Sequence, residues 1–283
     1  MTNFSNYKIC IINGYPEPNR KVLKDAGVKS NEDLYADVLK RNYPGIKTEF
    51  LYIADLFVDP YALDLKSYQA FIWTGSNLTI YHTDNEHVSR QIRFCKDLFE
   101  LGSPQYGSCW SIQMATVAAG GIVEKNPAGR EWCLARAITL TKAGKKHPLY
   151  AGKPHKFDAF MMHLDHVSKI PDHAVVLATN KHTPIQAMEV KYKNGTFWAQ
   201  QYHPEYNLKD MARLIFARTD AIAKENLVPN KEYLLTMVKD LEAIAKNPDN
   251  KMLRDKWQIG DDVLDTKILE CEIRNFFERL VFA

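Results

Sequence analysis

The chain contains 283 residues, of which 46% are hydrophobic and 25% are charged. These proportions are typical of a globular protein and exclude a disordered, collagen-like or disulfide-dominated chain. The 37 Lys and Arg residues exceed the 34 Asp and Glu residues by only three, and they form no basic block or stripe. We therefore expect no nucleic-acid partner, since nucleic-acid-binding surfaces concentrate positive charge.

The sequence carries no pattern for export or for insertion into a membrane. No apolar run approaches the roughly 18 residues that cross a bilayer, and the first residues lack the basic and apolar regions of a signal peptide. The five cysteines include no CxxC pair, which disfavours both a disulfide framework and a cysteine zinc site. We expect a cytoplasmic protein without membrane contact, in which one thiol is available for chemistry.

Strand-like and helical patterns alternate over the first half of the chain. Strands are predicted at residues 8–13, 46–53, 68–75 and 106–109. Helices are predicted at residues 30–42, 83–101 and 110–119, the second of them capped by Thr83-Asp84. This alternation predicts an α/β fold with a mainly parallel central sheet and helices on both faces.

The second half of the chain changes from strands to helices. Strands are predicted at residues 138–141, 157–163, 174–179, 185–192 and 197–202. A hairpin at Lys193-Asn194-Gly195 is predicted to join the last two strands. Helices are predicted at residues 208–226, 231–247 and 261–282. We therefore predict an α/β domain over residues 1–207 and a helical C-terminal extension over residues 208–283, packed on that domain.

The sharpest chemical motif is Gly107-Ser108-Cys109-Trp110-Ser111-Ile112-Gln113, at a predicted junction of strand and helix. A tight turn at such a junction lifts a nucleophilic side chain away from the sheet, and small flanking residues let the turn close. The thiol lies at a helix N-terminus, which favours the thiolate, and the Trp110 N–H is placed to donate to an oxyanion. A buried structural cysteine is the alternative, but the junction and the preceding glycine favour a nucleophile.

A histidine and a carboxylate follow the last predicted strand, in Gln201-Tyr202-His203-Pro204-Glu205. A thiol nucleophile requires a base, and the base requires an acceptor that orients it. His203 and Glu205 supply both functions from one turn that Pro204 makes rigid. Cys109, His203 and Glu205 are therefore the candidate catalytic triad.

Together these motifs resemble those of the class I glutamine amidotransferases, of the kind that forms the glutaminase part of GMP synthetase. The family pattern is G-x-C-x-G-x-Q around the nucleophile and an HPE-like run around the base. The resemblance implies that Cys109 is the nucleophile, that His203 is the general base and acid, and that Glu205 orients it. It also implies that Gln113 contacts the bound substrate.

Further matches follow the order of the family over residues 8–206. Trp73-Thr74-Gly75-Ser76-Asn77 takes the place of a Gly-Gly-Pro loop, so Gly75 and Ser76 are implied to form the oxyanion hole with Trp110. Met162-His163-Leu164-Asp165-His166-Val167 resembles a Ser-His-Gly-Asp-x-Val segment, which implies a substrate contact for His163. The fold implied is a flavodoxin-like, three-layer arrangement.

The chain departs from the family pattern at four positions. These are Ser76, Asn77, Ser111 and Leu164, each in place of a glycine or proline. The changes at Ser76, Asn77 and Leu164 alter the pocket, and none of the four removes a catalytic group.

Residues of metal-ligating type gather at His163, Asp165 and His166. In a strand, residues 163 and 165 face one side while residue 166 faces the other, and the sequence shows no matching ligand cluster elsewhere. We therefore expect no metal. We also expect no cofactor, because hydrolysis through a thioester requires none.

The leading hypothesis is hydrolysis of the side-chain amide of L-glutamine through a γ-glutamyl thioester on Cys109, with ammonia passed to an acceptor or to a partner synthetase. The alternative keeps the same triad and takes a γ-glutamyl peptide or amine. A third hypothesis is a binding protein that retains the fold without catalysis. Four roles remain open for the C-terminal helices: they dock a partner synthetase, cover the active site, form a homodimer, or only pack on the α/β domain.

Overall fold

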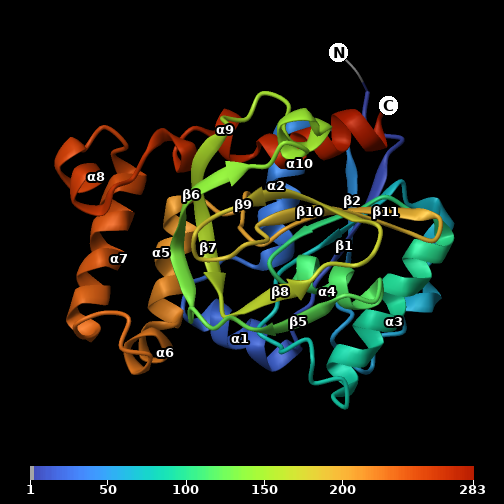
Figure 1. Ribbon diagram of the computed structural model, residues 1–283, viewed down its shortest axis with the longest axis horizontal. Coiled ribbons are helices and arrows are strands. Elements are labelled where there is room, and N and C mark those ends of the chain that lie inside the picture. Colours follow the sequence, from blue (N-terminus) through green and yellow to red (C-terminus); the bar gives the residue numbers. More distant parts are fainter. Residues whose placement is uncertain (1–2) are drawn as a thin grey trace.

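The protein is described by a computed structural model that covers residues 3–283 (Figure 1). Its strands are β1 (Lys8–Ile12), β2 (Lys47–Leu51), β3 (Ala70–Trp73), β4 (Gln105–Ser108), β5 (Ile122–Lys125), β6 (Glu131–Leu140), β7 (Lys156–His163), β8 (Asp165–Lys169), β9 (Ala174–Thr179), β10 (Ala187–Tyr192) and β11 (Gly195–Gln200). Nine of them form one sheet in the order β2-β1-β3-β4-β11-β10-β9-β6-β7, and β5 pairs with β8 in a small second sheet.

The helices are α1 (Glu17–Asp25), α2 (Asn31–Asn42), α3 (Glu86–Leu101), α4 (Trp110–Ala118), α5 (Leu208–Ala217), α6 (Thr219–Lys224), α7 (Lys231–Lys246), α8 (Lys251–Trp257), α9 (Thr266–Leu269) and α10 (Cys271–Phe276). Short 3-10 turns lie at Pro60–Ala62, Leu65–Ser67, Gly144–Lys146, Pro148–Tyr150 and Asp261–Val263, and a π-helical turn at Phe277–Val281. No helix within residues 3–283 combines the length and the hydrophobicity that crossing a bilayer demands.

The large sheet has a parallel part and an antiparallel part. Strands β2, β1, β3, β4 and β11 pair in parallel, and β10, β9, β6 and β7 continue from β11 with antiparallel pairing. The hairpin between β10 and β11 turns through Lys193, whose φ is 53°, as the Lys193-Asn194-Gly195 signal predicts. The predicted α/β fold with flanking helices is confirmed.

Helices cover both faces of the parallel part because its strands are apolar on both sides. In β1 every residue after Lys8 is buried, which is the pattern of a strand with packed layers above and below. Helices α2 and α10 share one apolar core with β1 and β3, and α3 and α4 share the other with the same two strands. The sequence therefore builds a three-layer body around the strands that lead to the site.

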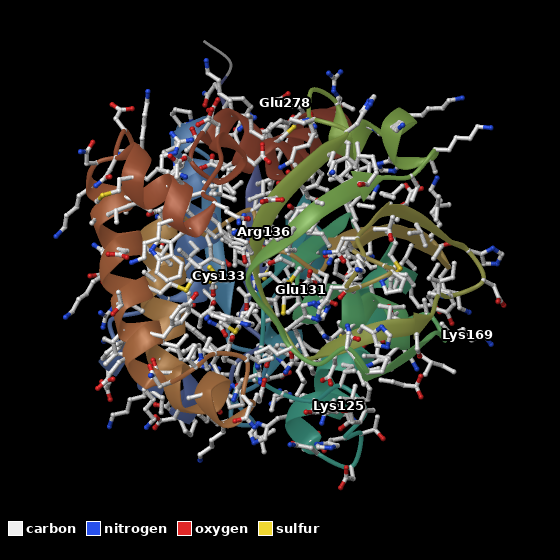
Figure 2. The ribbon with its side chains drawn as sticks, turned by 60° about the vertical axis from the view of Figure 1, so that its left-hand side comes forward. Lys125, Glu131, Cys133, Arg136, Lys169 and Glu278 are labelled. Carbon is white, nitrogen blue, oxygen red and sulfur yellow. The ribbon has the colours of Figure 1, made fainter. Side chains whose placement is uncertain are left out.

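Helices α5 and α7 form a third apolar core with α1 and the ends of β6 and β7. Helix α8 is joined to β6 by Arg136, which donates to the carbonyls of Trp257 (2.9 Å) and Gln258 (2.6 Å) (Figure 2). The chain then returns to the first core, where Phe282 packs on Phe4 with ring centroids 5.0 Å apart. The two ends of the described chain thus lie on the same face of the sheet (Figure 1).

A buried ion pair fixes α10 to the body. Lys153 donates to Glu272 at 2.9 Å, and both side chains are almost fully buried. The other oxygen of Glu272 accepts from the Tyr202 hydroxyl at 2.7 Å, and Tyr202 also contacts the Tyr150 hydroxyl at 2.7 Å. Because Tyr202 immediately precedes His203, this network links the last helices to the turn that carries the candidate base.

Several helices differ from their predicted bounds. The predicted helix at 208–226 breaks at Arg218 (φ −107°, ψ 7°), and the one at 261–282 is divided into α9, α10 and the π turn. Helix α3 is capped by the Asn85 side chain, which accepts from the His87 N–H at 2.9 Å, and not by Thr83-Asp84. Helix α1 is not among the predicted helices; its prolines lie at the helix start, where no N–H is required.

Candidate active site

The carboxyl ends of four neighbouring parallel strands meet at one edge of the sheet, where open α/β sheets place their ligands. Tyr15 follows β1, Gly75 follows β3, Cys109 follows β4 and His203 follows β11. Strands β4 and β11 are adjacent, with Ser108 opposite Gln200. The predicted nucleophile and base are therefore brought together by strand pairing between segments about 95 residues apart in the sequence.

Cys109 adopts a strained backbone conformation, with φ 55° and ψ −100°. Its N–H donates to the Gln200 carbonyl at 2.8 Å, and α4 begins at the next residue. Gly107 permits this turn: a Cβ at position 107 would lie 2.3 Å from Ser111 Oγ and 2.4 Å from the Trp73 carbonyl oxygen. Strain of this kind costs about 1–3 kcal/mol and persists where surrounding contacts enforce it.

His203 and Glu205 form a short, buried pair, with Nδ1 of His203 2.7 Å from Oε1 of Glu205. Burial lowers the pKa of His203, but the Glu205 carboxylate and the neighbouring Cys109 outweigh it and raise this pKa to about 10. The backbone N–H of His203 donates to the Phe160 carbonyl at 2.9 Å, and this bond fixes the turn to β7. The ring is therefore held in its cationic form beside the thiol.

A second line of hydrogen bonds supports the carboxylate. Ser108 Oγ donates to Glu205 Oε1 at 2.7 Å, so it accepts from the Tyr35 hydroxyl at 2.6 Å. Neither Ser108 nor Tyr35 was a candidate from the sequence. Ser108 belongs to the nucleophile motif, but Tyr35 lies on α2, and no local pattern relates it to the site.

The candidate oxyanion loop lies against the reacting groups. A Cβ on Gly75 would be 3.4 Å from His203 Cε1 and 4.0 Å from Cys109 Cβ. The Ser76 hydroxyl donates to the Gly14 carbonyl at 2.8 Å, which fixes the loop to the end of β1. Within residues 3–283 the N–H groups of Ser76 and Trp110 donate to no protein oxygen, so both are free to receive a developing negative charge.

Gln113 and His163 meet at one backbone oxygen. Gln113 Nε2 donates to the Asp165 carbonyl at 3.3 Å, and His163 Nδ1 lies 2.8 Å from the same oxygen. Asp165 itself also lines the cavity, and its carboxylate accepts from the Tyr81 hydroxyl at 3.2 Å. Burial, opposed by the bond from Tyr81, raises the pKa of Asp165.

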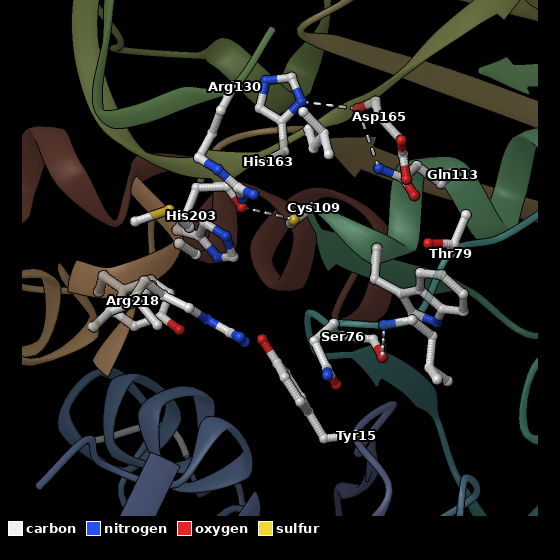
Figure 3. A pocket seen from close by; sticks show the side chains of 18 residues that line it. Tyr15, Ser76, Thr79, Cys109, Gln113, Arg130, His163, Asp165, His203 and Arg218 are labelled. Atoms are coloured by element: carbon white, nitrogen blue, oxygen red, sulfur yellow. Dashed lines mark hydrogen bonds between the residues drawn. The ribbon is translucent and has the colours of Figure 1, made fainter. Parts of the chain in front are cut away.

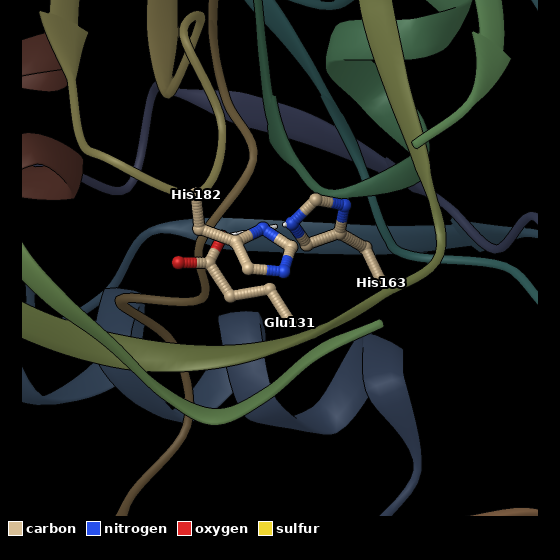
Figure 4. A group of neighbouring side chains, drawn as sticks. All are labelled: Glu131, His163 and His182. Atoms are coloured by element: carbon tan, nitrogen blue, oxygen red, sulfur yellow. Dashed lines mark hydrogen bonds and ion pairs between the residues drawn. The ribbon is translucent and has the colours of Figure 1, made fainter. Parts of the chain in front are cut away.

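Behind the cavity, His163 is part of a cluster with Glu131 and His182, whose ligand-type atoms lie within 4.8 Å of one another (Figure 4). No local pattern in the sequence indicates this cluster, because its residues come from three separate segments. Glu131 Oε2 is already hydrogen-bonded, since it lies 3.0 Å from His163 Nε2 and accepts from Gln186 Nε2 at 2.8 Å. A cation would have to displace these bonds, so the cluster serves best as a support that fixes the His163 ring.

A cavity of about 180 Å³ opens beside the Cys109 thiol (Figure 3). Six of the eight predicted site residues line this cavity: Ser76, Cys109, Trp110, Gln113, His163 and His203. Of the other two, Glu205 stands behind His203, and Gly75 lies against His203 and Cys109. Six further residues of the lining were not predicted from the sequence: Tyr15, Arg130, Tyr206, Leu214, Arg218 and Ala221. Three of these residues come from α5, α6 and the break between them.

The comparison with protein families identifies the class of the molecule. The model for the glutamine amidotransferase class-I family matches residues 81–221, a span that includes Cys109, His203, Glu205 and the helix α5. The chain belongs to the class I glutamine amidotransferases, and it is an enzyme of the amidohydrolase type.

Individual relatives agree with this class. A γ-glutamyl-L-1-hydroxyisopropylamide hydrolase from a Pseudomonas species is 31% identical over 281 residues, which cover 97% of this chain and 93% of that protein. A glutamine-hydrolysing GMP synthase from Thermosipho africanus is 33% identical over 136 residues, which cover 48% of this chain and 24% of that protein. The fold matches the crystal structure of a glutamine amidotransferase from Thermotoga maritima with a TM-score of 0.67 and 17% identity, over 98% of this chain and 99% of that one.

Proposed function

We propose that the protein hydrolyses γ-glutamyl amides through a covalent intermediate on Cys109. The observation that carries this proposal is the arrangement of the Cys109 thiol and the His203 ring at one cavity, with the Glu205 carboxylate behind the ring at 2.7 Å from Nδ1. The raised pKa of His203, about 10, supports a charged imidazolium beside the thiol at neutral pH. A cysteine paired with a protonated histidine is the activated form of this nucleophile.

In the first step the Cys109 thiolate attacks the γ-carbonyl carbon of the substrate, and the carbonyl oxygen becomes an oxyanion. The N–H groups of Trp110 and of the Gly75–Ser76 loop supply hydrogen bonds to that oxygen. The C–N bond then breaks, and His203 gives its proton to the departing nitrogen. The products of this step are a free amine, or ammonia, and a γ-glutamyl thioester.

In the second step His203, now neutral, takes a proton from water, and the hydroxide attacks the thioester carbonyl. The C–S bond breaks, glutamate leaves and the thiolate with its imidazolium partner is restored. Glu205 stabilises the imidazolium and holds the ring through Nδ1. The balance is one amide and one water consumed, with one glutamate and one amine formed.

Gln113, His163 and Asp165 are proposed to receive the α-amino and α-carboxylate groups of the γ-glutamyl part. They share one wall of the cavity, and the bonds to the Asp165 carbonyl hold Gln113 and His163 in fixed orientations. We propose that no metal or cofactor takes part. The surroundings of Glu131 support the absence of a metal. His163, Thr183 and Gln186 contact Glu131 Oε2 and occupy the lone pairs that a cation would need.

The substrate is either L-glutamine or a substituted γ-glutamyl amide. The similarity to the Pseudomonas hydrolase favours the second class, because it extends along the C-terminal helices as well as the α/β part. The similarity to GMP synthases favours glutamine. In that case residues 208–283 would contact a partner synthetase or a second copy of the chain. We propose a γ-glutamyl amide as the principal substrate. We further propose a cytoplasmic location, which the five free cysteines support.

The test is glutamate release from L-glutamine and from γ-L-glutamyl isopropylamide by the wild-type protein and by Cys109→Ala. We expect release by the wild type and a fall of at least about 10⁴-fold in the variant, because the nucleophile is lost. Equal rates of release by the two proteins would show that Cys109 is not the nucleophile, and no release from either amide would leave the protein as a binding module without catalysis. A circular dichroism spectrum and melting curve of Cys109→Ala serve as the control for folding.

A further inference from the structure

Arg218 holds a guanidinium group in the active-site cavity without a counter-charge. It lies at the break between α5 and α6, where its N–H contacts the carbonyls of Leu214 and Ile215, and its side chain lines the cavity with Cys109. Within residues 3–283 no carboxylate forms an ion pair with Arg218. The second arginine of the cavity, Arg130, is instead held by both oxygens of Glu225 at 2.7 and 2.9 Å. Arg218 is thus the cation in this site that lacks a fixed acidic partner.

The guanidinium lies on the side of the site from which the amine must leave. His203 has to reach the departing nitrogen, so that nitrogen lies beside His203. The His203 ring contacts Tyr206 with centroids 4.7 Å apart, and Arg218 lies close enough to Tyr15 to oppose the effect of burial, which raises the pKa of Tyr15 to about 12. Figure 3 shows His203 and Arg218 to the left of Cys109, Gln113 and Asp165 to its right, and Tyr15 below it with its hydroxyl toward Arg218.

The remaining wall on this side is apolar and close. Leu214 and Ala221 line it, and Leu214 is 3% exposed. The cavity of about 180 Å³ is smaller than the roughly 300–1,000 Å³ typical of drug-sized ligand sites. The leaving amine is therefore small, with a short apolar substituent and a group that an arginine binds.

We propose that Arg218 binds a carboxylate carried by the leaving amine, so that the preferred substrates are γ-glutamyl derivatives of small α-amino acids. This inference rests on the proposed γ-glutamyl hydrolysis. A guanidinium matches a carboxylate with two parallel hydrogen bonds, whereas a hydroxyl group offers a single weaker acceptor and the unsubstituted amide nitrogen of glutamine carries no group for it to bind. Arg218 is a specificity-determining residue in this assignment, and the bond cleavage itself belongs to Cys109 and His203.

Two substrates of nearly the same shape test the assignment. γ-L-Glutamyl-L-alanine and γ-L-glutamyl isopropylamide differ by a carboxylate in place of a methyl group on the leaving amine. We expect a higher kcat/KM for the alanine derivative in the wild type. In Arg218→Gln the ratio of the two kcat/KM values is expected to fall by about 10- to 100-fold, the loss typical of hydrogen bonds to a charged group. Arg218→Lys should recover part of the ratio, because the charge remains without the fork.

Lys224→Gln is the matched control, because it removes a positive charge from an exposed position at the end of α6, the helix that Arg218 precedes. We expect it to keep the wild-type ratio. A fall of equal size for both substrates in Arg218→Gln would show that Arg218 binds the γ-glutamyl part, and equal kcat/KM values in the wild type would show no carboxylate selection. Either result overturns the inference while γ-glutamyl hydrolysis stands. Failure to hydrolyse both compounds and L-glutamine would instead overturn the proposed function, and this inference with it.

Discussion

At the scale of single residues, the chemistry depends on the charge state of His203. The ring is 4% exposed, and burial alone would favour its neutral form. The Glu205 carboxylate and Cys109 reverse this preference and raise the pKa of His203 from 6.5 to about 10. One carboxylate therefore sets both the orientation and the protonation of His203, the proposed base.

The same pKa shift makes folding stability depend on pH. Because the folded-state pKa is above the unfolded value of about 6.5, the stabilisation is fully present below pH 6.5 and is lost as the pH rises through about 10. Glu205→Gln removes the charge that holds the proton. We expect the variant to be less stable than the wild type by an amount that is largest near pH 6 and shrinks toward pH 10, as measured by urea denaturation.

Glu86→Gln is the control for this measurement, because Glu86 is exposed and pairs with Arg93 at the surface. Its stability difference from the wild type should stay small and constant over the same pH range. A Glu205→Gln deficit that does not change between pH 6 and pH 10 would contradict the assigned pKa of His203.

The residues of the site differ in how far the sequence could predict them. Cys109, His203 and Glu205 stand in two short motifs whose spacing follows from a strand followed by a turn, so their positions could be predicted. Arg218 could not, because its side chain reaches the cavity only where a helix breaks. Tyr35 reaches the carboxylate through the packing of α2 on the sheet, which no local pattern encodes.

At the scale of elements, the turn between β4 and α4 carries the proposed nucleophile, and the loop after β3 carries the proposed oxyanion donors. Their two glycines meet different surroundings. A Cβ on Gly107 would collide with Ser111 Oγ at 2.3 Å and with the Trp73 carbonyl at 2.4 Å, whereas a Cβ on Gly75 would touch its nearest atom, His203 Cε1, at 3.4 Å.

These two glycines give a matched pair of alanine variants. Gly107→Ala should lower the free energy of unfolding by about 3 kcal/mol, because the backbone must move to accept the methyl group. Gly75→Ala should change it by less than about 1 kcal/mol and yet lower kcat/KM by at least about tenfold, because the methyl group stands where the substrate carbonyl enters. Denaturation curves and glutamate release measure the two effects. A stable and fully active Gly107→Ala would contradict the geometry of the turn.

The strands of the parallel part were more predictable than the other elements. The short apolar runs of β1 and β3 are bounded by turn residues, so their positions follow from local patterns, whereas β5 and β8 were not predicted and β6 begins at Glu131 instead of residue 138. The division of the C-terminal segment into several helices could not be predicted, because an amphipathic pattern over 261–282 is compatible with one helix or with several in line. The break at Glu270 and Cys271 places Glu272 toward Lys153, a tertiary contact outside the reach of periodicity.

At the scale of the whole molecule, the last helices are bound to the α/β body by the pair Lys153–Glu272. Both charges are buried, and Glu272 also accepts from Tyr202, next to the candidate base. Removal of one partner leaves an uncompensated charge in the interior, which costs about 3–5 kcal/mol. Replacement of both by apolar side chains avoids that cost.

A double-mutant cycle tests this connection. We expect Lys153→Met and Glu272→Met each to be destabilised, and the double variant to lose less than the sum of the two by at least about 1 kcal/mol. The exposed pair Arg93–Glu86 is the matched control, with an expected coupling between 0 and about 1 kcal/mol. Additive losses at Lys153 and Glu272 would show that the buried pair does not join the C-terminal helices to the body.

The central claim is that a γ-glutamyl group is carried on Cys109, and trapping by hydroxylamine tests it most directly. Hydroxylamine competes with water for a thioester and forms γ-glutamyl hydroxamate in place of glutamate. The wild-type protein with γ-L-glutamyl-L-alanine or L-glutamine should form the hydroxamate while glutamate falls correspondingly, and Cys109→Ala should form neither. Formation of either product by Cys109→Ala at the wild-type rate would contradict the mechanism.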